Sequence, residues 1–169
     1  MTPAPRRELA YVALGANLGD PVAQVEAAIA AIAALPQTRL VARSSLYRTA
    51  PVGYRDQPDF INAVAGIETA LAPRALLDAL LAIERAAGRV REFPNAPRTI
   101  DLDVLVYGGR TIDEPGLAVP HPRLHERAFV LLPLAEIAGD LEIPGRGRVA
   151  ELARAAGTAG VERLAAEVR

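Results

Sequence analysis

The order of apolar patterns along the chain constrains its fold more than any other feature of the sequence. Four short apolar runs have the character of strands, and two longer segments repeat apolar side chains at helical spacing. The strand-like runs are residues 9–14, 39–47, 60–69 and 100–107, and the helical segments are residues 21–35 and 73–87. The elements follow one another as strand–helix–strand, twice. This order predicts an α+β fold, a ferredoxin-like split βαβ sheet with helices packed on it.

Helix signals and later apolar runs complete the expected organisation. Asp20 is placed to cap the first helix, Pro21 suits its first position, and Pro36 marks its end. Extra C-terminal elements are expected as an edge hairpin near 111–113, a helix over 128–137 that contains Pro133, a strand at 141–143 and a helix over 148–156. The tail, residues 157–169, is expected to add a turn or two through Val161, Leu164 and Val168. We expect residues 1–169 to form a single domain.

Two acidic side chains interrupt the last core strand at a spacing of two. Alternate residues of a strand share a face, so Asp101 and Asp103 are expected to project together, roughly 6 to 7 Å apart. The residues expected to face the core instead are Ile100, Leu102, Val104 and Val106. Like charges held this close favour a divalent cation, and hard oxygen ligands favour Mg²⁺ and with it phosphates. The alternative is that both carboxylates form ordinary surface ion pairs.

Arginines surround this acidic pair in the sequence. Arg98 lies three residues before the first aspartate, and Arg85, Arg89 and Arg91 lie shortly before that. All 19 basic residues are arginine, which excludes a lysine Schiff base and a phosphate-loop lysine. Any phosphate must therefore be bound by arginine.

Composition excludes several other classes of protein. The chain has no cysteine, and its two serines, Ser44 and Ser45, lie outside any G-x-S-x-G turn, so a disulfide framework, a thiolate metal site and a serine hydrolase are not expected. The formal charge of −1 gives no electrostatic footprint for nucleic acid. No apolar run resembles a signal peptide or a membrane span. We expect a monomeric cytoplasmic protein with no nucleic-acid or membrane partner.

Several short motifs, in one order, resemble the hydroxymethyldihydropterin pyrophosphokinase family of folate biosynthesis. The motifs are residues 47–53, 57–63, 84 with 88–91, 97–103, 119–123 and 127–129. The resemblance extends from about residue 11 to residue 143. It implies the split-sheet fold and transfer of the pyrophosphoryl group of ATP to the hydroxymethyl group of 6-hydroxymethyl-7,8-dihydropterin, with release of AMP. The small-molecule partners implied are thus ATP and the pterin.

The resemblance also implies roles for individual residues. Asp101 and Asp103 match the ligands of two Mg²⁺ ions. The residues that match catalytic positions are Arg89, Arg91, Arg98, Asp101 and Asp103. Those that match ATP contacts are Glu84, Arg91, Arg98, Val104, His121 and Arg127. Those that match pterin contacts are Thr49, Ala50, Val52, Phe60, Asn62 and Phe129.

Other interpretations of the same residues remain open at this point. Glu84 could equally be an exposed helix residue, and Phe60 and Phe129 could be core side chains. Asn95 stands where some family members carry tryptophan. The main alternative from another class is a non-catalytic split βαβ module that binds a nucleotide or RNA. Such a module would not need Phe60, Asn62 and Phe129 to form a second pocket.

Overall fold

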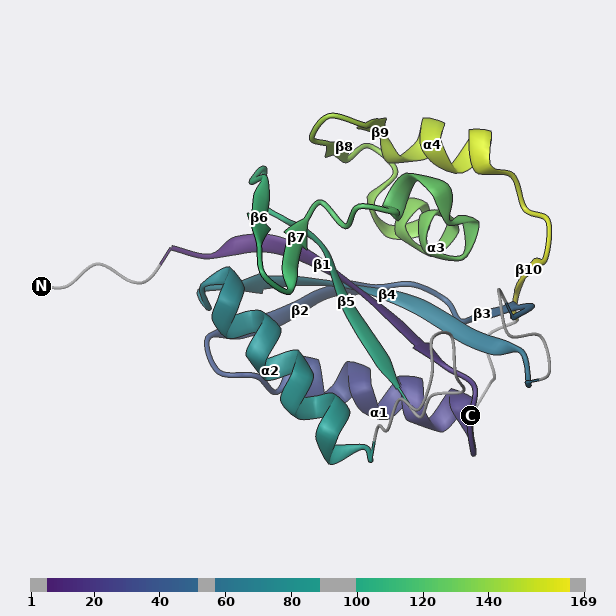
Figure 1. Ribbon diagram of the computed structural model, residues 1–169, viewed down its shortest axis with the longest axis horizontal. Helices are drawn as coiled ribbons and strands as arrows, with labels where there is room; N and C mark the ends of the chain where they lie inside the picture. Colours follow the sequence, from purple (N-terminus) through teal and green to yellow (C-terminus); the bar gives the residue numbers. More distant parts are fainter. Residues whose placement is uncertain (1–5, 52–56, 89–99, 165–169) are drawn as a thin grey trace, which may run out of the picture.

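A computed structural model describes residues 6–51, 57–88 and 100–164 of the chain (Figure 1). Its first half contains β1 (Glu8–Ala16), α1 (Pro21–Ala33), β2 (Thr38–Arg43), β3 (Tyr47–Thr49), β4 (Phe60–Thr69), α2 (Pro73–Ala86) and β5 (Asp101–Tyr107). The remaining elements are β6 (Ile112–Glu114), β7 (Leu117–Val119), the 3₁₀ turn η1 (Leu124–Glu126), α3 (Ala128–Ala138), β8 (Glu142–Ile143), β9 (Gly147–Arg148), α4 (Val149–Ala156) and β10 (Val161–Arg163). The predicted α+β order of elements is confirmed.

The main sheet is antiparallel and has the predicted split topology. Its strands follow the order β10-β3-β4-β1-β5, and β2 also pairs with β4. Because β4 lies between β1 and β2, the two strands joined by α1 are separated by one strand, as a split βαβ unit requires. The acidic strand β5 pairs with β1 and so forms the opposite edge from β10.

Helices cover both faces of the sheet. α1 and α2 lie on one face, whereas α3 and α4 lie on the other (Figure 1). Apolar side chains form a cluster on each face: Leu14, Ile32 and Leu80 belong to the first cluster, and Leu131 and Leu134 of α3 belong to the second. In the described part of the chain, no helix combines the length and the apolar character needed to cross a membrane.

The predicted start of the first helix is confirmed in atomic detail. The Asp20 carboxylate accepts a hydrogen bond from the backbone N–H of Ala23 at 3.1 Å, and Pro21 occupies the first turn. This contact satisfies one of the backbone donors that a helix leaves unpaired at its start. The helix ends at Ala33, just before Pro36.

The expected single strand over 39–47 is divided into β2 and β3. Ser44 leaves the regular ladder: its hydroxyl accepts from the backbone N–H of Val64 at 2.9 Å, and its own N–H donates to the Val64 carbonyl at 2.9 Å. The next residue, Ser45, donates its backbone N–H to the side chain of Glu136 on α3. In the segment that links β2 to β3, hydrogen bonds to side chains thus take the place of regular strand pairing.

A bulge in β5 places Val106 on the opposite face of the sheet from the one predicted. The register changes from Val12 opposite Val104 to Tyr11 opposite Val106, so Leu105 is an extra residue. Leu102 and Val104 therefore pack on the α1 and α2 side, as predicted. Leu105 and Val106 both join the cluster on the α3 side, and the expectation that Val106 shares the face of Val104 is wrong.

The tail also departs from the expectation of further turns through Val161 and Leu164. Instead, β10 pairs with the outer edge of β3, with Val161 opposite Thr49, and Leu164 donates its N–H to the Leu46 carbonyl at 2.9 Å. The unpaired backbone groups of β3 provide these partners, which local spacing cannot reveal. Val168 lies outside the described residues. The expected hairpin, the helix through Pro133, the short strand and the helix after residue 148 are present.

Candidate active site

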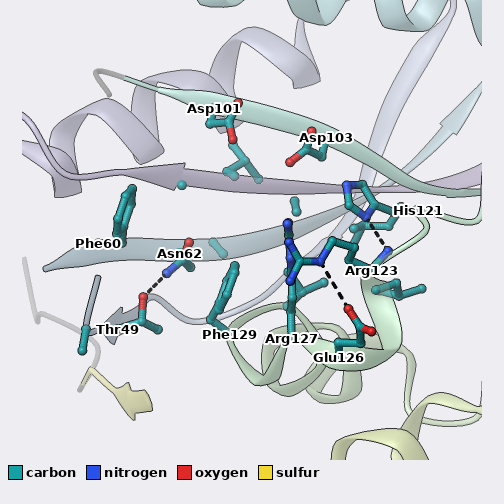
Figure 2. Close-up of a pocket in the computed structure, with 18 residues that line it drawn as sticks. Thr49, Phe60, Asn62, Asp101, Asp103, His121, Arg123, Glu126, Arg127 and Phe129 are labelled. Carbon is teal, nitrogen blue, oxygen red and sulfur yellow. Dashed lines mark hydrogen bonds and ion pairs between the residues drawn. The ribbon is translucent and has the colours of Figure 1, made fainter. Parts of the chain in front are cut away.

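A cavity of about 260 Å³ lies between the sheet and the segment formed by η1 and α3 (Figure 2). Strands β1, β3, β4 and β5 contribute one wall, and residues 121–130 contribute the other. The predicted site residues that line it are Thr49, Ala50, Phe60, Asn62, Asp101, Asp103, His121, Arg127 and Phe129. Residues far apart in the sequence are thus brought to one place. Val52, Arg89, Arg91 and Arg98 lie outside the described residues.

The two aspartates occupy the predicted positions on one face of β5. Asp101 and Asp103 are both half-buried and both line the cavity (Figure 2). Their partners across the ladder are Gly15, which has no side chain, and Ala13, whose side chain is small, and both border the cavity. The carboxylates therefore border a volume that a ligand can enter.

The acidic pair fits a Mg²⁺ site that a ligand would complete. No group of three or more His, Cys, Asp or Glu side chains suitable for a metal occurs among the described residues. Mg²⁺ is commonly bound by one or two carboxylates together with phosphate oxygens and water, rather than by a cage made only of protein. Two carboxylates beside an open cavity match that pattern.

His121 is held by its backbone and by one ring nitrogen. Its N–H donates to the Leu105 carbonyl of β5 at 2.9 Å, and its Nδ1 accepts from the Arg123 backbone N–H at 3.2 Å. Burial lowers the pKa of His121, and the charges of Arg127 and Arg123 lower it further, against an opposite effect from Asp101. The ring is therefore neutral at pH 7 and carries its proton on Nε2. A neutral Nε2–H can donate to a ligand oxygen.

Two arginines face the acidic strand across the cavity. The Arg127 guanidinium lies 5.7 Å from the centroid of the Phe129 ring, within cation–π range. The Arg123 Nε donates to Glu126 at 3.2 Å, and both side chains line the cavity. In Figure 2, Arg123, just before η1, and Arg127, just before α3, lie on the side of the cavity opposite Asp101 and Asp103.

Arg123 and Glu126 also line the cavity, although neither has a predicted role. Arg123 lies inside the 119–123 motif, between His121 and Arg127. Its place in this motif could have identified Arg123 as a residue of the cavity. Glu126 offered no comparable signal, because its ion pair with Arg123 follows from the 3₁₀ turn.

The other end of the cavity combines two aromatic rings with an amide. Figure 2 shows Asn62 between Phe60 and Phe129. Both rings are half-buried, and Phe129 also packs against the cluster on the α3 side, whereas Asn62 and Thr49 are buried. The Asn62 Nδ2 donates to the Thr49 hydroxyl at 2.7 Å, which fixes the amide plane. This end therefore offers aromatic surfaces and a fixed set of polar atoms.

Gly15 is required for this placement of Asn62. A Cβ atom at residue 15 would lie 2.8 Å from the Asn62 Oδ1, closer than real Cβ contacts come. Because Gly15 has no side chain, the amide oxygen of Asn62 can lie against the backbone of β1 at this residue.

Two predicted ATP contacts do not line the cavity of the described residues. Glu84 is only 4% exposed and lies on α2, where it accepts a hydrogen bond from the Leu102 backbone N–H at 2.8 Å. The alternative that Glu84 is an exposed helix residue is therefore excluded. The Val104 side chain packs in the core on the opposite face of β5. Glu84 instead fixes the backbone between Asp101 and Asp103.

Comparison with known proteins assigns the family. The model of the 7,8-dihydro-6-hydroxymethylpterin-pyrophosphokinase family matches residues 11–139. A 2-amino-4-hydroxy-6-hydroxymethyldihydropteridine pyrophosphokinase of Pseudomonas aeruginosa is 52% identical over 91% of this chain and 95% of its own length. The enzyme of the same name from Haemophilus influenzae is 50% identical over 86% and 91%.

Solved structures share the fold at low sequence identity. A crystal structure of an HPPK-DHPS in complex with substrates gives a TM-score of 0.71 at 14% identity over 88% of this chain. Wild-type HPPK-DHPS of Plasmodium falciparum gives 0.68 at 14% identity over 90%. The chain spans less than half of these two longer proteins, 43% and 42% of their length. The family match and the close relatives together show that the chain belongs to the 7,8-dihydro-6-hydroxymethylpterin-pyrophosphokinase family.

Proposed function

We infer that this chain transfers the terminal pyrophosphoryl group of ATP to 6-hydroxymethyl-7,8-dihydropterin in folate biosynthesis. The pterin hydroxyl oxygen forms a bond to the β-phosphorus, the bond from that phosphorus to the oxygen bridging to the α-phosphorus breaks, and AMP leaves. The hydroxyl proton is released. One observation carries this inference: a single cavity joins an aromatic and amide end to an end that carries paired carboxylates and arginines.

The aromatic end suits a flat heterocycle. We propose that the pterin lies between Phe60 and Phe129, because offset stacking on two rings stabilises a planar bicyclic ligand. Asn62 and Thr49 would read its polar edge, with Ala50 and Val52 beside it. The hydrogen bond from Asn62 to Thr49 supports this role, because it holds the amide in place before a ligand arrives.

At the polar end, we propose that Asp101 and Asp103 hold Mg²⁺, with two ions expected. Bound Mg²⁺ would neutralise phosphate charge and lower the pKa of the attacking hydroxyl. The guanidinium of Arg127 and the Nε2–H of His121 would hold phosphate or ribose oxygens, and Arg123 would add a further cation. We propose the same phosphate role for Arg89, Arg91 and Arg98 from the resemblance.

Glu84 has a different role in the proposal from that of the residues that line the cavity. Glu84 would act on the nucleotide side by holding the β5 backbone rather than through a contact from the cavity. We further propose that the enzyme works as a cytoplasmic monomer on these two small molecules. A slightly negative formal charge of −1 supports the absence of a nucleic-acid partner.

Measuring AMP formation with and without the pterin tests the function. With ATP, Mg²⁺ and the pterin, AMP and pyrophosphorylated pterin should form in equal amounts, and neither should form when the pterin is omitted. AMP release that does not depend on the pterin would contradict the proposal. Nucleotide binding without any turnover would favour the non-catalytic module.

A further inference from the structure

Glu136 joins α3 to the edge of the sheet that bounds the aromatic end of the cavity. It lies about two helical turns after Phe129, so both side chains lie near one side of α3. Glu136 itself does not line the cavity. Its contacts are instead with the segment that leads into β3 and with β10.

Donors from three positions surround the Glu136 carboxylate. The Ser45 backbone N–H donates to both oxygens at 3.1 and 3.0 Å, and the Ser45 hydroxyl donates at 2.9 Å. The Tyr47 hydroxyl donates to Oε1 at 2.6 Å. The Arg163 guanidinium of β10 lies 3.6 Å from Oε2, and its Nε donates to the Ser45 hydroxyl at 3.2 Å. We call Ser45, Tyr47, Glu136 and Arg163 the Glu136 cluster.

The Glu136 cluster is connected to the proposed pterin contacts by short paths. Tyr47 and Thr49 alternate on β3 and are both buried, and Thr49 holds Asn62 through its hydroxyl. At the other end, α3 carries Phe129. The cluster is therefore a fixed point between the helix that carries one wall and the strand that carries the opposite wall.

We propose that Glu136 is a positioning residue for the pterin, because it fixes the separation between Phe129 on α3 and the Thr49–Asn62 pair on the sheet. The proposal rests on the proposed function of the cavity. Stacking and hydrogen bonding both depend steeply on distance, so a small shift of α3 weakens both at once. At the polar end, Asp101, Asp103 and His121 are anchored separately from α3, through β5 and the backbone of His121, whereas Arg127 lies at the start of α3 beside Phe129.

The charges in the Glu136 cluster agree with a permanent anchor. Burial raises the pKa of the Glu136 carboxyl, but hydrogen bonds from Tyr47 and Ser45 and the charge of Arg163 outweigh burial and lower it. Burial and the neighbouring carboxylate raise the pKa of Tyr47, which therefore remains a donor. At neutral pH, the Glu136 carboxylate therefore stays ionised and accepts hydrogen bonds, and the Tyr47 hydroxyl keeps the proton that it donates.

Replacing Glu136 by glutamine tests the proposal with little change in shape. Glu136→Gln places an NH₂ donor against groups that are themselves donors. We expect KM and calorimetric Kd for the pterin to rise at least about fivefold, and Kd for a non-hydrolysable ATP analogue to rise clearly less, because Asp101, Asp103 and His121 do not depend on the position of α3. Tyr47→Phe removes one hydrogen bond and should produce a smaller change of the same kind. This second variant keeps the test valid if Glu136→Gln does not fold.

Glu26 provides a matched control on the opposite face of the sheet. Its carboxylate accepts from both Nη atoms of Arg43, at 2.6 and 3.1 Å, and this pair joins α1 to β2. Glu26→Gln should lower the melting temperature without a change in pterin affinity. The same pterin loss in Glu26→Gln and Glu136→Gln would overturn the positioning role, because it would report general loosening.

Two further outcomes are decisive. A folded Glu136→Gln enzyme with unchanged pterin Kd would overturn the proposal, and so would equal losses for pterin and nucleotide. Failure of the proposed function has a different result: the wild-type protein itself would not bind the pterin. The two failures are therefore distinguished by the wild-type titration alone.

Discussion

At Asp101 and Asp103, the exchange of one carboxylate oxygen for nitrogen removes a charge and keeps the shape. Because both side chains line the cavity on the same face of β5, Asp101→Asn or Asp103→Asn should leave the fold intact. We expect kcat to fall at least about a hundredfold, or about 2.7 kcal/mol of barrier. Steady-state rates across a Mg²⁺ titration measure this effect. Near wild-type turnover with an unchanged Mg²⁺ dependence would exclude these residues as metal ligands.

Gly15 supplies a second prediction at the scale of one residue. In Gly15→Ala, the new Cβ would meet Asn62 Oδ1 at 2.8 Å, so the amide must move. We expect pterin binding to weaken by about 1 to 3 kcal/mol, the cost of losing a buried hydrogen-bonding group, with ATP affinity nearly unchanged. Gly109→Ala is the control, because a Cβ there meets nothing within 4 Å. Calorimetric titration of both ligands into both variants gives the answer.

Among the elements, those with local signals could be predicted and those that depend on distant partners could not. The cap at Asp20 and the apolar run of β4 can be identified from neighbouring residues. The break at Ser44 depends on Val64 and Glu136, which are distant in sequence. Likewise, β10 forms because β3 has an open edge, a property that no spacing of apolar residues encodes.

The contact between α3 and β3 predicts a pH dependence of stability. Because Glu136 has a lowered pKa in the folded protein, its contribution is complete above the ordinary value of 4.5 and is lost as the pH falls through the folded value. The melting temperature of the wild type should therefore exceed that of Glu136→Gln at neutral pH, and the difference should shrink in acid below 4.5. Thermal unfolding across this pH range measures it. A difference that stays constant into acid would contradict the assignment.

Across the whole molecule, the cavity joins two ends that different parts of the chain supply. We expect losses to separate by ligand: Phe60→Ala should weaken pterin binding by about 1 to 3 kcal/mol and leave ATP binding nearly unchanged. Arg123→Ala should weaken ATP binding by only about 0.5 to 1 kcal/mol, because its side chain is 63% exposed. Titration of each ligand into each variant measures the separation. Equal losses for both ligands in Phe60→Ala would indicate general damage.

At this scale, the sequence predicts which residues lie at the site better than it predicts how they are arranged there. Motifs identified Asn62 and His121, which the fold brings to one cavity. They could not show that Glu84 is buried against the backbone of β5, because that depends on how α2 packs. They also did not distinguish the role of Arg123, whose direction is set by the turn at η1 and by Glu126.

The pairing of β10 with β3 has a consequence for the order of folding. The neighbouring strands β3 and β4 close a short loop, whereas the pairing of Val161 with Thr49 closes a loop that contains most of the chain. Long loops cost more entropy to close, so such contacts form late on average. We therefore expect β10 to join the edge of the sheet after β3 and β4 have paired, so the side of the sheet beside the aromatic end is completed late in folding.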